Sequence, residues 1–578
     1  MIARILRFLG LLRPASQKDG QLVQEPTQAD TGGLSSQAIR PSASVSIKGL
    51  NGASLSVPDG TATSSLPAAK TASRPAPFQQ IAQRSAFSSP MAPIAAQSEK
   101  SQKPQLTVPR SSNSNRTESR RLLQQRLELL PSDLDDRARA IAETCHISTK
   151  EMAALEERLA AGIEATPVEG QTGRPIEVVL GLDFGTTSTK LVARLPYESG
   201  SPTFAVPAPL FARAEGHPYL WSSRLWLTPD GVFSLCPLPR AAVACAIKAN
   251  LMISPSAPRA VLRVAGAEAN SEEVAAAFLA LQLRQARGWL KSERSTMFRH
   301  RKMIWSYNFG FPAASLNDNA LRESYERCTV SALILADGRD AITLSAVRSA
   351  LAVPAANAAA ELEQASAALV PEIAAAVSGF AKSTRLDDDL YALVDVGGGT
   401  VDCCTFNLFK LADGGARCPI FEAEVQLLGA EPWSICQHDE LLGEELRHQL
   451  DLQQRGVIWR TKKDRYPASE RWISGLPLFF VGGGIESPPH QGSTRGLDGW
   501  LRKHNAKGGG VRITPLPPPD GLDHSLCEAG LVHRLAVAIG LSLPVTDIPE
   551  VELPGNIEDV FTGKRPPTDG NYVGKEQT

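Results

Sequence analysis

The sequence lacks the features that would commit it to several common protein classes. Lys and Arg number 60 against 61 Asp and Glu, a formal net charge of −1, so nothing global favours a nucleic-acid partner or an anionic bilayer. No uncharged apolar run approaches the ~18 residues that cross a bilayer, which argues against a transmembrane segment. The nine cysteines form no CxxC pair, which gives no sign of a zinc or dithiol site and favours reduced thiols in a cytoplasm.

The N-terminal region differs in composition from the rest of the chain. Residues 1–13, MIARILRFLGLLR, place apolar and Arg side chains on opposite faces of an amphipathic helix, which indicates weak peripheral membrane contact, a partner groove, or an incidental terminal helix. The following sequence is rich in Ser, Ala, Pro, Gln and Thr. Such a stretch buries too little apolar area to offset chain ordering, so we expect residues 1–115 to be disordered.

Residues 116–165 predict a small helical segment of three short helices. Leucines repeat at three- and four-residue steps in its first part, at Leu122, Leu123, Leu127 and Leu130. Pro131 ends that run. Two pairs of an N-cap hydroxyl and an acid three residues later mark further helix starts, Ser132 with Asp135 and Ser148 with Glu151. The segment is either a partner-binding module or a helical collar packed on the domain that follows.

After Pro175, short apolar strands alternate with longer helical patterns, which is typical of an α/β fold. The region is too large for one core and suits two lobes, which we place at 176–385 and 386–545, with a C-terminal tail at 546–578. Two expectations concern its helices. Ser271 is expected to cap a helix that begins at the next residue, and an alanine-rich helical insertion is expected over 333–369.

The first candidate site follows an apolar, β-branched strand over 176–182. The sequence continues as DFGTTSTK at 183–190 and then as a second strand at 191–195. Gly and hydroxyl residues in a tight turn present backbone N–H groups and side-chain donors to phosphate oxygens. Asp183, at the strand end, is placed to hold magnesium, usually through water. The alternative is a turn whose Thr hydroxyls satisfy their own backbone.

Two further apolar strands end in glycine-rich turns. One leads into DVGGGTVD at 395–402, and the other leads into VGGGIESP at 481–488. Consecutive glycines let the backbone approach a ligand where any Cβ would collide. One such turn is weak evidence of a binding site, whereas three in one chain, two of them with a leading Asp, form a much more specific pattern.

In sequence and order, these segments resemble the nucleotide motifs of the actin, sugar kinase and heat-shock 70 superfamily. Residues 183–190 resemble its first phosphate motif, 395–402 its second, and 481–488 its adenosine motif. The GGGT followed by Asp is most similar to the heat-shock 70 and bacterial actin-like branch. The resemblance covers about residues 176–545. It implies an α/β fold of two ribonuclease-H-like lobes, with ATP and Mg²⁺ in the cleft between them.

The resemblance also implies roles for the motif residues. Asp183 and Asp395 would organise Mg²⁺, and Asp402 would orient the attacking water or the metal shell. The residues implied to wrap the β- and γ-phosphates are Gly185, Thr186 and Thr187 on one side and Gly397, Gly398, Gly399 and Thr400 on the other. Those implied to face the adenosine are Gly482, Gly483 and Gly484. Positioning and charge stabilisation would supply most of the catalysis.

Three other positions are compared with the heat-shock 70 pattern. Lys248 stands about where those ATPases carry a lysine that contacts the γ-phosphate, and an exposed helical lysine is the alternative. Pro312 resembles their switch proline, or else simply ends a strand. Those proteins have a Glu-Pro pair, whereas here the acid follows the proline in Pro371-Glu372. That order favours an ordinary helix N-terminus for Glu372.

The expected function is that of an atypical heat-shock 70-like ATPase, in which hydrolysis of Mg-ATP to ADP and phosphate drives a conformational switch. The sequence after Leu541 is too short for the peptide-binding part of the chaperones, so a protein partner is expected at the N-terminal region or on the lobe surfaces. The alternatives are a small-molecule kinase and an actin-like, nucleotide-dependent scaffold. Asp183 and Asp395 indicate magnesium in all three and do not discriminate between them.

Overall fold

The computed structural model describes most of the chain after residue 112. The described residues are 113–128, 136, 139–140, 144, 146–165, 173–253, 255–312, 318–352, 354–381, 388–411, 415–517, 521–523 and 530–552. The predicted helix at 1–13, the predicted disorder up to residue 112, the predicted helix start at Ser132 and most of the C-terminal tail lie outside this set. No helix within it is long and apolar enough to cross a membrane.

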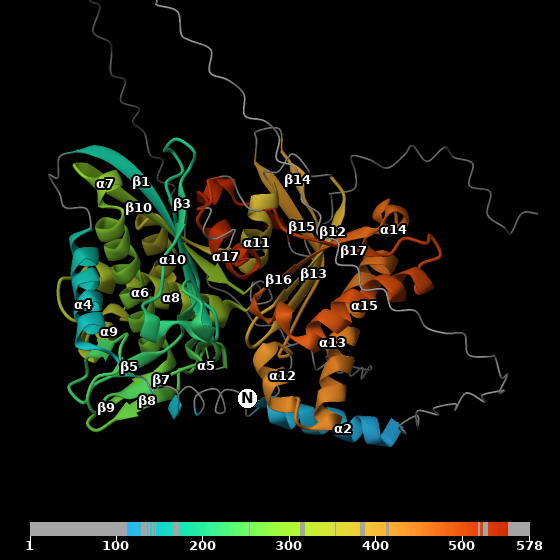
Figure 1. Cartoon of the computed structure of the whole chain (residues 1–578), viewed down its shortest axis with the longest axis horizontal. Helices are drawn as coiled ribbons and strands as arrows, with labels where there is room; N and C mark the ends of the chain where they lie inside the picture. The colour runs from blue at the N-terminus through green and yellow to red at the C-terminus, as the bar shows by residue number, and fades with distance from the viewer. Residues whose placement is uncertain are drawn as a thin grey trace, which may run out of the picture. The chain divides into compact units, whose positions relative to one another are not determined.

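The first sheet has a central strand with an antiparallel hairpin on one side and two parallel strands on the other (Figure 1). Its main strands, in order across the sheet, are β11 (Ala367–Pro371), β10 (Arg301–Phe311), β1 (Arg174–Asp183), β2 (Ser188–Arg194) and β3 (Thr203–Ala205). Strand β1 runs antiparallel to β2 and parallel to β10, which in turn runs parallel to β11. Helices α6 (Ser271–Glu293) and α8 (Asn319–Asp337) complete its core.

The second sheet repeats this arrangement. Its main strands, in order, are β15 (Ala416–Gln426), β13 (Val401–Asn407), β12 (Leu390–Val396), β16 (Leu476–Val481) and β17 (Val511–Thr514). Strand β12 runs antiparallel to β13 and parallel to β16, which runs parallel to β17. Helix α13 (Glu440–Arg460) precedes β16, as α6 precedes β10. The α/β fold expected from the sequence is therefore confirmed, with mixed sheets that share one topology.

Two helices join the sheets, because each one packs against the sheet that it does not follow in the sequence. Helix α11 (Glu372–Ala381) comes after the first sheet but packs into the core of the second, where the rings of Phe380 and Phe479 lie 4.8 Å apart. Helix α17 (Val532–Leu541) comes after the second sheet and packs Leu535 beside Val192 of the first. The two helices also contact each other between the sheets (Figure 1).

The crossing of α11 and α17 depends on a glycine. A Cβ added to Gly540 would lie 1.7 Å from the carbonyl oxygen of Ala375, a backbone atom. Because neither helix backbone can move away without losing its packing, only glycine fits here. This contact fixes how closely the two helices approach.

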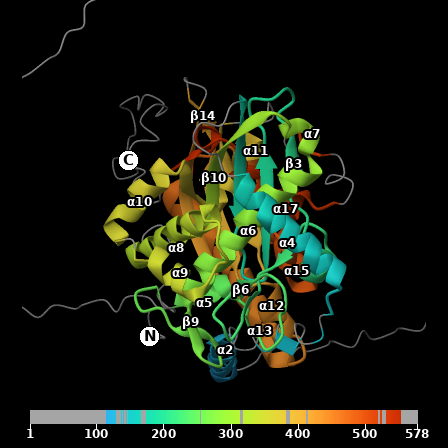
Figure 2. The same ribbon diagram turned by 90° about the vertical axis from the view of Figure 1, so that its left-hand side faces the viewer.

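Each described helix of the N-terminal segment packs against a different sheet. Helix α4 (Thr149–Glu164) begins with the predicted capping box of Ser148 and Glu151. It lies along α6 (Figure 2), where Gly162 and Gly288 allow close backbone contact. Helix α2 (Asn113–Glu128) packs against α13 and buries Leu123 in the core of the second sheet. The collar interpretation therefore matches the packing, while partner binding stays a prediction.

Replacing Leu123 by alanine is expected to destabilise the docked α2. Leu123 is 2% exposed, whereas the neighbouring Leu122 is 37% exposed. Removal of the buried side chain should therefore cost about 3 kcal/mol, and Leu122→Ala should cost far less. Chemical denaturation of both variants, with limited proteolysis after Arg120 and Arg121, measures the difference. Equal stabilities of the two variants would contradict the docking of α2.

Two predicted helix details are wrong. The N-cap of α6 is Asn270, whose side chain accepts a hydrogen bond from the backbone of Glu273, and Ser271 is already the first helical residue. Asparagine caps helices as well as serine does, so Asn270 takes the cap position one residue earlier. The expected helical insertion over 333–369 is interrupted, because residues 367–371 form β11 at the edge of the first sheet. Pairing with β10 outweighs the local alanine-rich composition.

Candidate functional site

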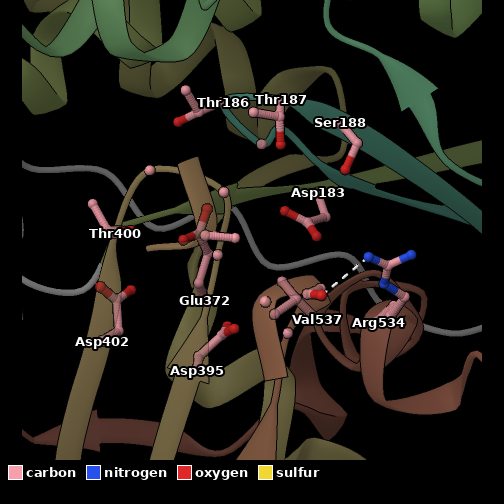
Figure 3. A pocket seen from close by; sticks show the side chains of 18 of the residues that line it. Asp183, Thr186, Thr187, Ser188, Glu372, Asp395, Thr400, Asp402, Arg534 and Val537 are labelled. Atoms are coloured by element: carbon pink, nitrogen blue, oxygen red, sulfur yellow. Dashed lines mark hydrogen bonds between the residues drawn. The ribbon is translucent and has the colours of Figure 1, made fainter. Parts of the chain in front are cut away.

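All three glycine-rich turns line one cavity. It is bounded by the ends of β1 and β2 from the first sheet, by β12, β13 and β16 from the second, and by α5 (Ile247–Ile253), α11 and α17. Every predicted site residue lines it, namely Asp183, Gly185, Thr186, Thr187, Lys248, Asp395, Gly397, Gly398, Gly399, Thr400, Asp402, Gly482, Gly483 and Gly484. Figure 3 shows the hydroxyl residues of the first turn facing Thr400 and the carboxylates from the other side.

The shared topology explains why the two aspartates meet. Asp183 lies at the end of β1 and Asp395 near the end of β12, each in the central strand of its sheet just before the hairpin. Their cross-strand partners occupy equivalent places but differ in charge. Asp183 is opposite Lys190, and Asp395 is opposite Asp402. The Lys190 ammonium lies 3.0 Å from the Asp183 carboxylate, so the first sheet presents a neutralised pair and the second two acids.

Glycine is required where the turns approach each other. A Cβ on Gly398 would lie 2.4 Å from Oγ1 of Thr187, so the first and second turns touch across the cavity. Gly482 has φ of +94°, and a Cβ there would lie 2.3 Å from Oδ1 of Asp395. A side chain at Gly398 would collide with Thr187, and one at Gly482 would collide with the Asp395 carboxylate. These contacts bring backbone groups from both sheets to one small volume.

Burial raises the pKa of the two carboxyl groups on the second sheet. Desolvation, with a further contribution from the charge of Asp183, raises the pKa of Asp395 to about 7. Desolvation and the neighbouring Asp395 likewise raise the pKa of Asp402 well above its usual range. Oδ1 of Asp402 is buried and has no hydrogen-bond partner in the structure. A cation bound beside these carboxyl groups would favour their ionised form, and a bound water would satisfy the unpartnered oxygen of Asp402.

Lys248 and Glu372 form an ion pair at the edge of this group. Nζ of Lys248 lies 2.6 Å from Oε1 of Glu372. Burial by itself lowers the pKa of Lys248, but the charges of Glu372, Tyr325 and Asp183 and the hydrogen bond to Glu372 together outweigh it, and the net shift is upward. Lys248 is 7% exposed, so the alternative of an exposed helical lysine is wrong. Glu372 does begin a helix, as expected, and also lines the cavity.

The cavity is also lined by Pro312 and by three residues that no sequence motif predicts. Pro312 had been compared with a switch proline, and it lines the cavity directly after β10. Glu215, His533 and Arg534 were not singled out. Glu215 lies in the short 3-10 turn η2 (Ala214–Gly216) between β3 and β4 (Trp221–Ser222), and the other two lie in the first turn of α17. No motif marks these positions, and only the packing of α17 against the first sheet brings them near Gly483.

The residues fit a hydrated cation better than a fully protein-ligated one. Within the described part of the chain, no three His, Cys, Asp or Glu side chains form a cluster that would grip a metal ion directly. Magnesium usually keeps several water ligands and uses one or two carboxylates together with substrate phosphates. Asp183 and Asp395, with the unpartnered Asp402 oxygen beside them, suit that mode of binding.

Comparison of the chain with models of protein families found no match, and a comparison with curated proteins found none either. The geometry of the cavity therefore carries the functional argument.

Proposed function

We propose that this chain is a heat-shock 70-like ATPase, in which hydrolysis of Mg-ATP to ADP and phosphate drives a conformational switch. On this proposal the two sheets are the ribonuclease-H-like lobes of the superfamily and the cavity between them is the ATP site. The observation that carries the proposal is the convergence of turns 183–190, 395–402 and 481–488, which are far apart in the chain, on one cavity lined by buried or half-buried carboxylates and a buried lysine.

Phosphate binding is assigned to the first two turns. Backbone N–H groups at Gly185 and at 397–399, with the Thr186, Thr187 and Thr400 hydroxyls, supply donors to phosphate oxygens. The close approach of Gly398 and Thr187 supports this assignment, because it would place donors from both sheets around one phosphate chain. The distance between these two turns would depend on the ligand bound between them. The separation of the two sheets would therefore change with the ligand.

Charge stabilisation is assigned to the buried ionic groups. A bound magnesium ion would neutralise charge on the β- and γ-phosphate oxygens. Asp183 and Asp395 would hold its water shell, and Asp402 would accept a hydrogen bond from the water that attacks the γ-phosphate. Lys248, held by Glu372 at 2.6 Å, would stabilise the charge that develops on the transferred group. None of these groups forms a covalent bond with the substrate.

The proposal is tested by equilibrium binding and single-turnover hydrolysis of Mg-ATP with the full-length protein. Asp402→Asn is expected to keep nucleotide affinity and to lower turnover by about 10²-fold, because it removes the group that orients water. Asp230→Asn, in an exposed turn, is the matched control. If the wild-type chain has no affinity for Mg-ATP, the proposal is wrong. Nucleotide binding without turnover would leave a sensor or scaffold, and ADP production that depends on a small hydroxyl compound would indicate a kinase.

A partner for the switch is proposed at the N-terminal helices. Helix α2 packs on the second sheet and α4 on the first, so a change in the separation of the sheets would change the distance between the two helices. This supports the N-terminal region as the place where another protein detects the nucleotide state.

A further inference from the structure

A buried arginine at one end of the cavity has most of its hydrogen-bonding capacity unused. The Arg534 side chain is 4% exposed. Its Nη2 donates to Oε2 of Glu215 at 2.6 Å and to the carbonyl oxygen of Gly483 at 3.0 Å. Its Nε and Nη1 are buried and have no partner in the structure. Figure 3 shows the guanidinium directed from α17 towards the cavity.

Unsatisfied buried donors of a charged group are rare, because each one loses its hydration without a replacement. A structural arginine would have its nitrogens paired, as Arg284 does with the carbonyl oxygens of Leu335, Ala336, Gly338 and Asp340. Arg534 instead stands among the residues of the third glycine turn, and its guanidinium would contact a Cβ on Gly483 at 3.1 Å. The absence of a side chain at Gly483 leaves room for this guanidinium beside the turn.

The surroundings of Arg534 come from both sheets. Glu215 belongs to the loop after β3 of the first sheet, adopts φ of +52°, and has a side chain that is 63% exposed. His533, next to Arg534, has an unpartnered Nε2. Burial and the charge of Arg534 lower the pKa of His533, so its ring is neutral near pH 7. Glu215, His533 and Arg534 line the same cavity as the two phosphate turns, and Arg534 contacts the third turn at Gly483.

We propose that Arg534 recognises the nucleoside end of the bound nucleotide through its unpartnered N–H groups, while Glu215 holds the guanidinium from the side of the first sheet. This inference rests on the proposed function. The ligand supplies hydrogen-bond acceptors, which are ribose oxygens or ring nitrogens of the base. Arg534 links Glu215, on the side of the first sheet, to the Gly483 carbonyl oxygen after β16 of the second sheet. This link also slows release of a nucleotide lying beneath it.

The first test compares Arg534→Gln with wild type in binding of Mg-ATP, Mg-ADP and Mg-tripolyphosphate. Loss of Arg534 is expected to weaken ATP and ADP by about tenfold each, the usual effect of losing hydrogen bonds to a charged group. Tripolyphosphate affinity should not change, because that ligand has no nucleoside. Arg502→Gln, which removes an arginine paired with Asp498 on an exposed helix face, is the control for loss of charge.

The outcomes separate this inference from the proposed function. If wild type binds neither ATP nor tripolyphosphate, the proposed function fails. If wild type binds ATP and Arg534→Gln binds it equally well, the role of Arg534 is wrong although the ATP site stands. A parallel loss of ATP and tripolyphosphate affinity would assign Arg534 to the phosphates or to folding, and would also overturn the inference.

A second variant keeps the inference testable if Arg534→Gln does not fold. Glu215→Gln alters an exposed side chain and is expected to fold normally. It should release ATP and ADP about fivefold faster in stopped-flow displacement, because the charge that fixes the Arg534 guanidinium beside the third turn is gone. Dissociation of tripolyphosphate should stay the same. Unchanged nucleotide release by Glu215→Gln would show that this residue does not hold the arginine over the ligand.

Discussion

Above pH 7, the ligand-free Asp395→Asn protein is expected to be more stable than wild type and to have lost Mg-ATP turnover. In the folded state the pKa of Asp395 is about 7, raised first by burial and then by Asp183. Ionisation of this carboxyl therefore costs free energy in the folded state and not in the unfolded one. Asparagine has the same shape without that cost. The same change removes a proposed support of the metal's water shell, so turnover should fall by about 10²-fold or more.

The sign of the pH dependence follows from the raised pKa. Below the ordinary aspartate pKa the carboxyl is protonated in both states, and the two proteins should differ little. As pH rises from the ordinary aspartate pKa towards the folded-state value of about 7, wild type loses stability relative to the variant, on the order of 4 kcal/mol in total, and above pH 7 the difference stays constant. Thermal unfolding between pH 5 and 8 measures this, with Asp230→Asn as the exposed control. Addition of Mg-ATP should reverse the order, and a variant that is less stable than wild type at every pH would contradict the account.

Gly540→Ala is expected to destabilise the whole described fold after residue 173. The new Cβ would lie 1.7 Å from the oxygen of Ala375, and helices α11 and α17 would have to separate. Since both helices pack into cores of the two sheets, we expect a loss of 3 kcal/mol or more in the free energy of unfolding, by the usual cost of overpacking.

The control for Gly540→Ala is the same substitution in an open position. Gly492 lies in α15 (Pro488–His504), and a Cβ there would meet nothing within 4 Å. Alanine favours helix, so Gly492→Ala should raise stability by about 0.5–1 kcal/mol. If the two helices cross as closely as the structure shows, urea denaturation gives a lower free energy of unfolding than wild type for Gly540→Ala and a higher one for Gly492→Ala. Similar values for both would mean that α11 and α17 can separate at little cost.

The sequence predicted the site better at its phosphate turns than at its other end. Each turn follows an apolar strand and carries glycine, which is a local pattern readable within about ten residues. The placement of all the predicted residues around one cavity follows from that pattern together with the repeated sheet topology. Arg534 and Glu215 have no local pattern, because their contact joins residues at opposite ends of the described fold.

Glu372 shows why spacing alone misled. The sequence Pro371-Glu372 is typical of a helix start, and that interpretation described the backbone correctly. That interpretation did not predict the ion pair between Glu372, at the helix start, and Lys248 from α5. Strand β11 was missed for a similar reason. Its residues are compatible with a helix locally, and pairing with β10 decides the outcome.

The exchange of α11 and α17 between the sheets has a consequence for how the molecule could arise and be divided. A polypeptide cut between residues 381 and 388 would yield two pieces, each carrying a helix that belongs on the other. The first piece would lack α17 and the second would lack α11. Neither piece could therefore cover its own sheet, and each would fold only with its counterpart. The repeated halves are therefore inseparable as modules, although their strand order suggests descent from one ancestral unit.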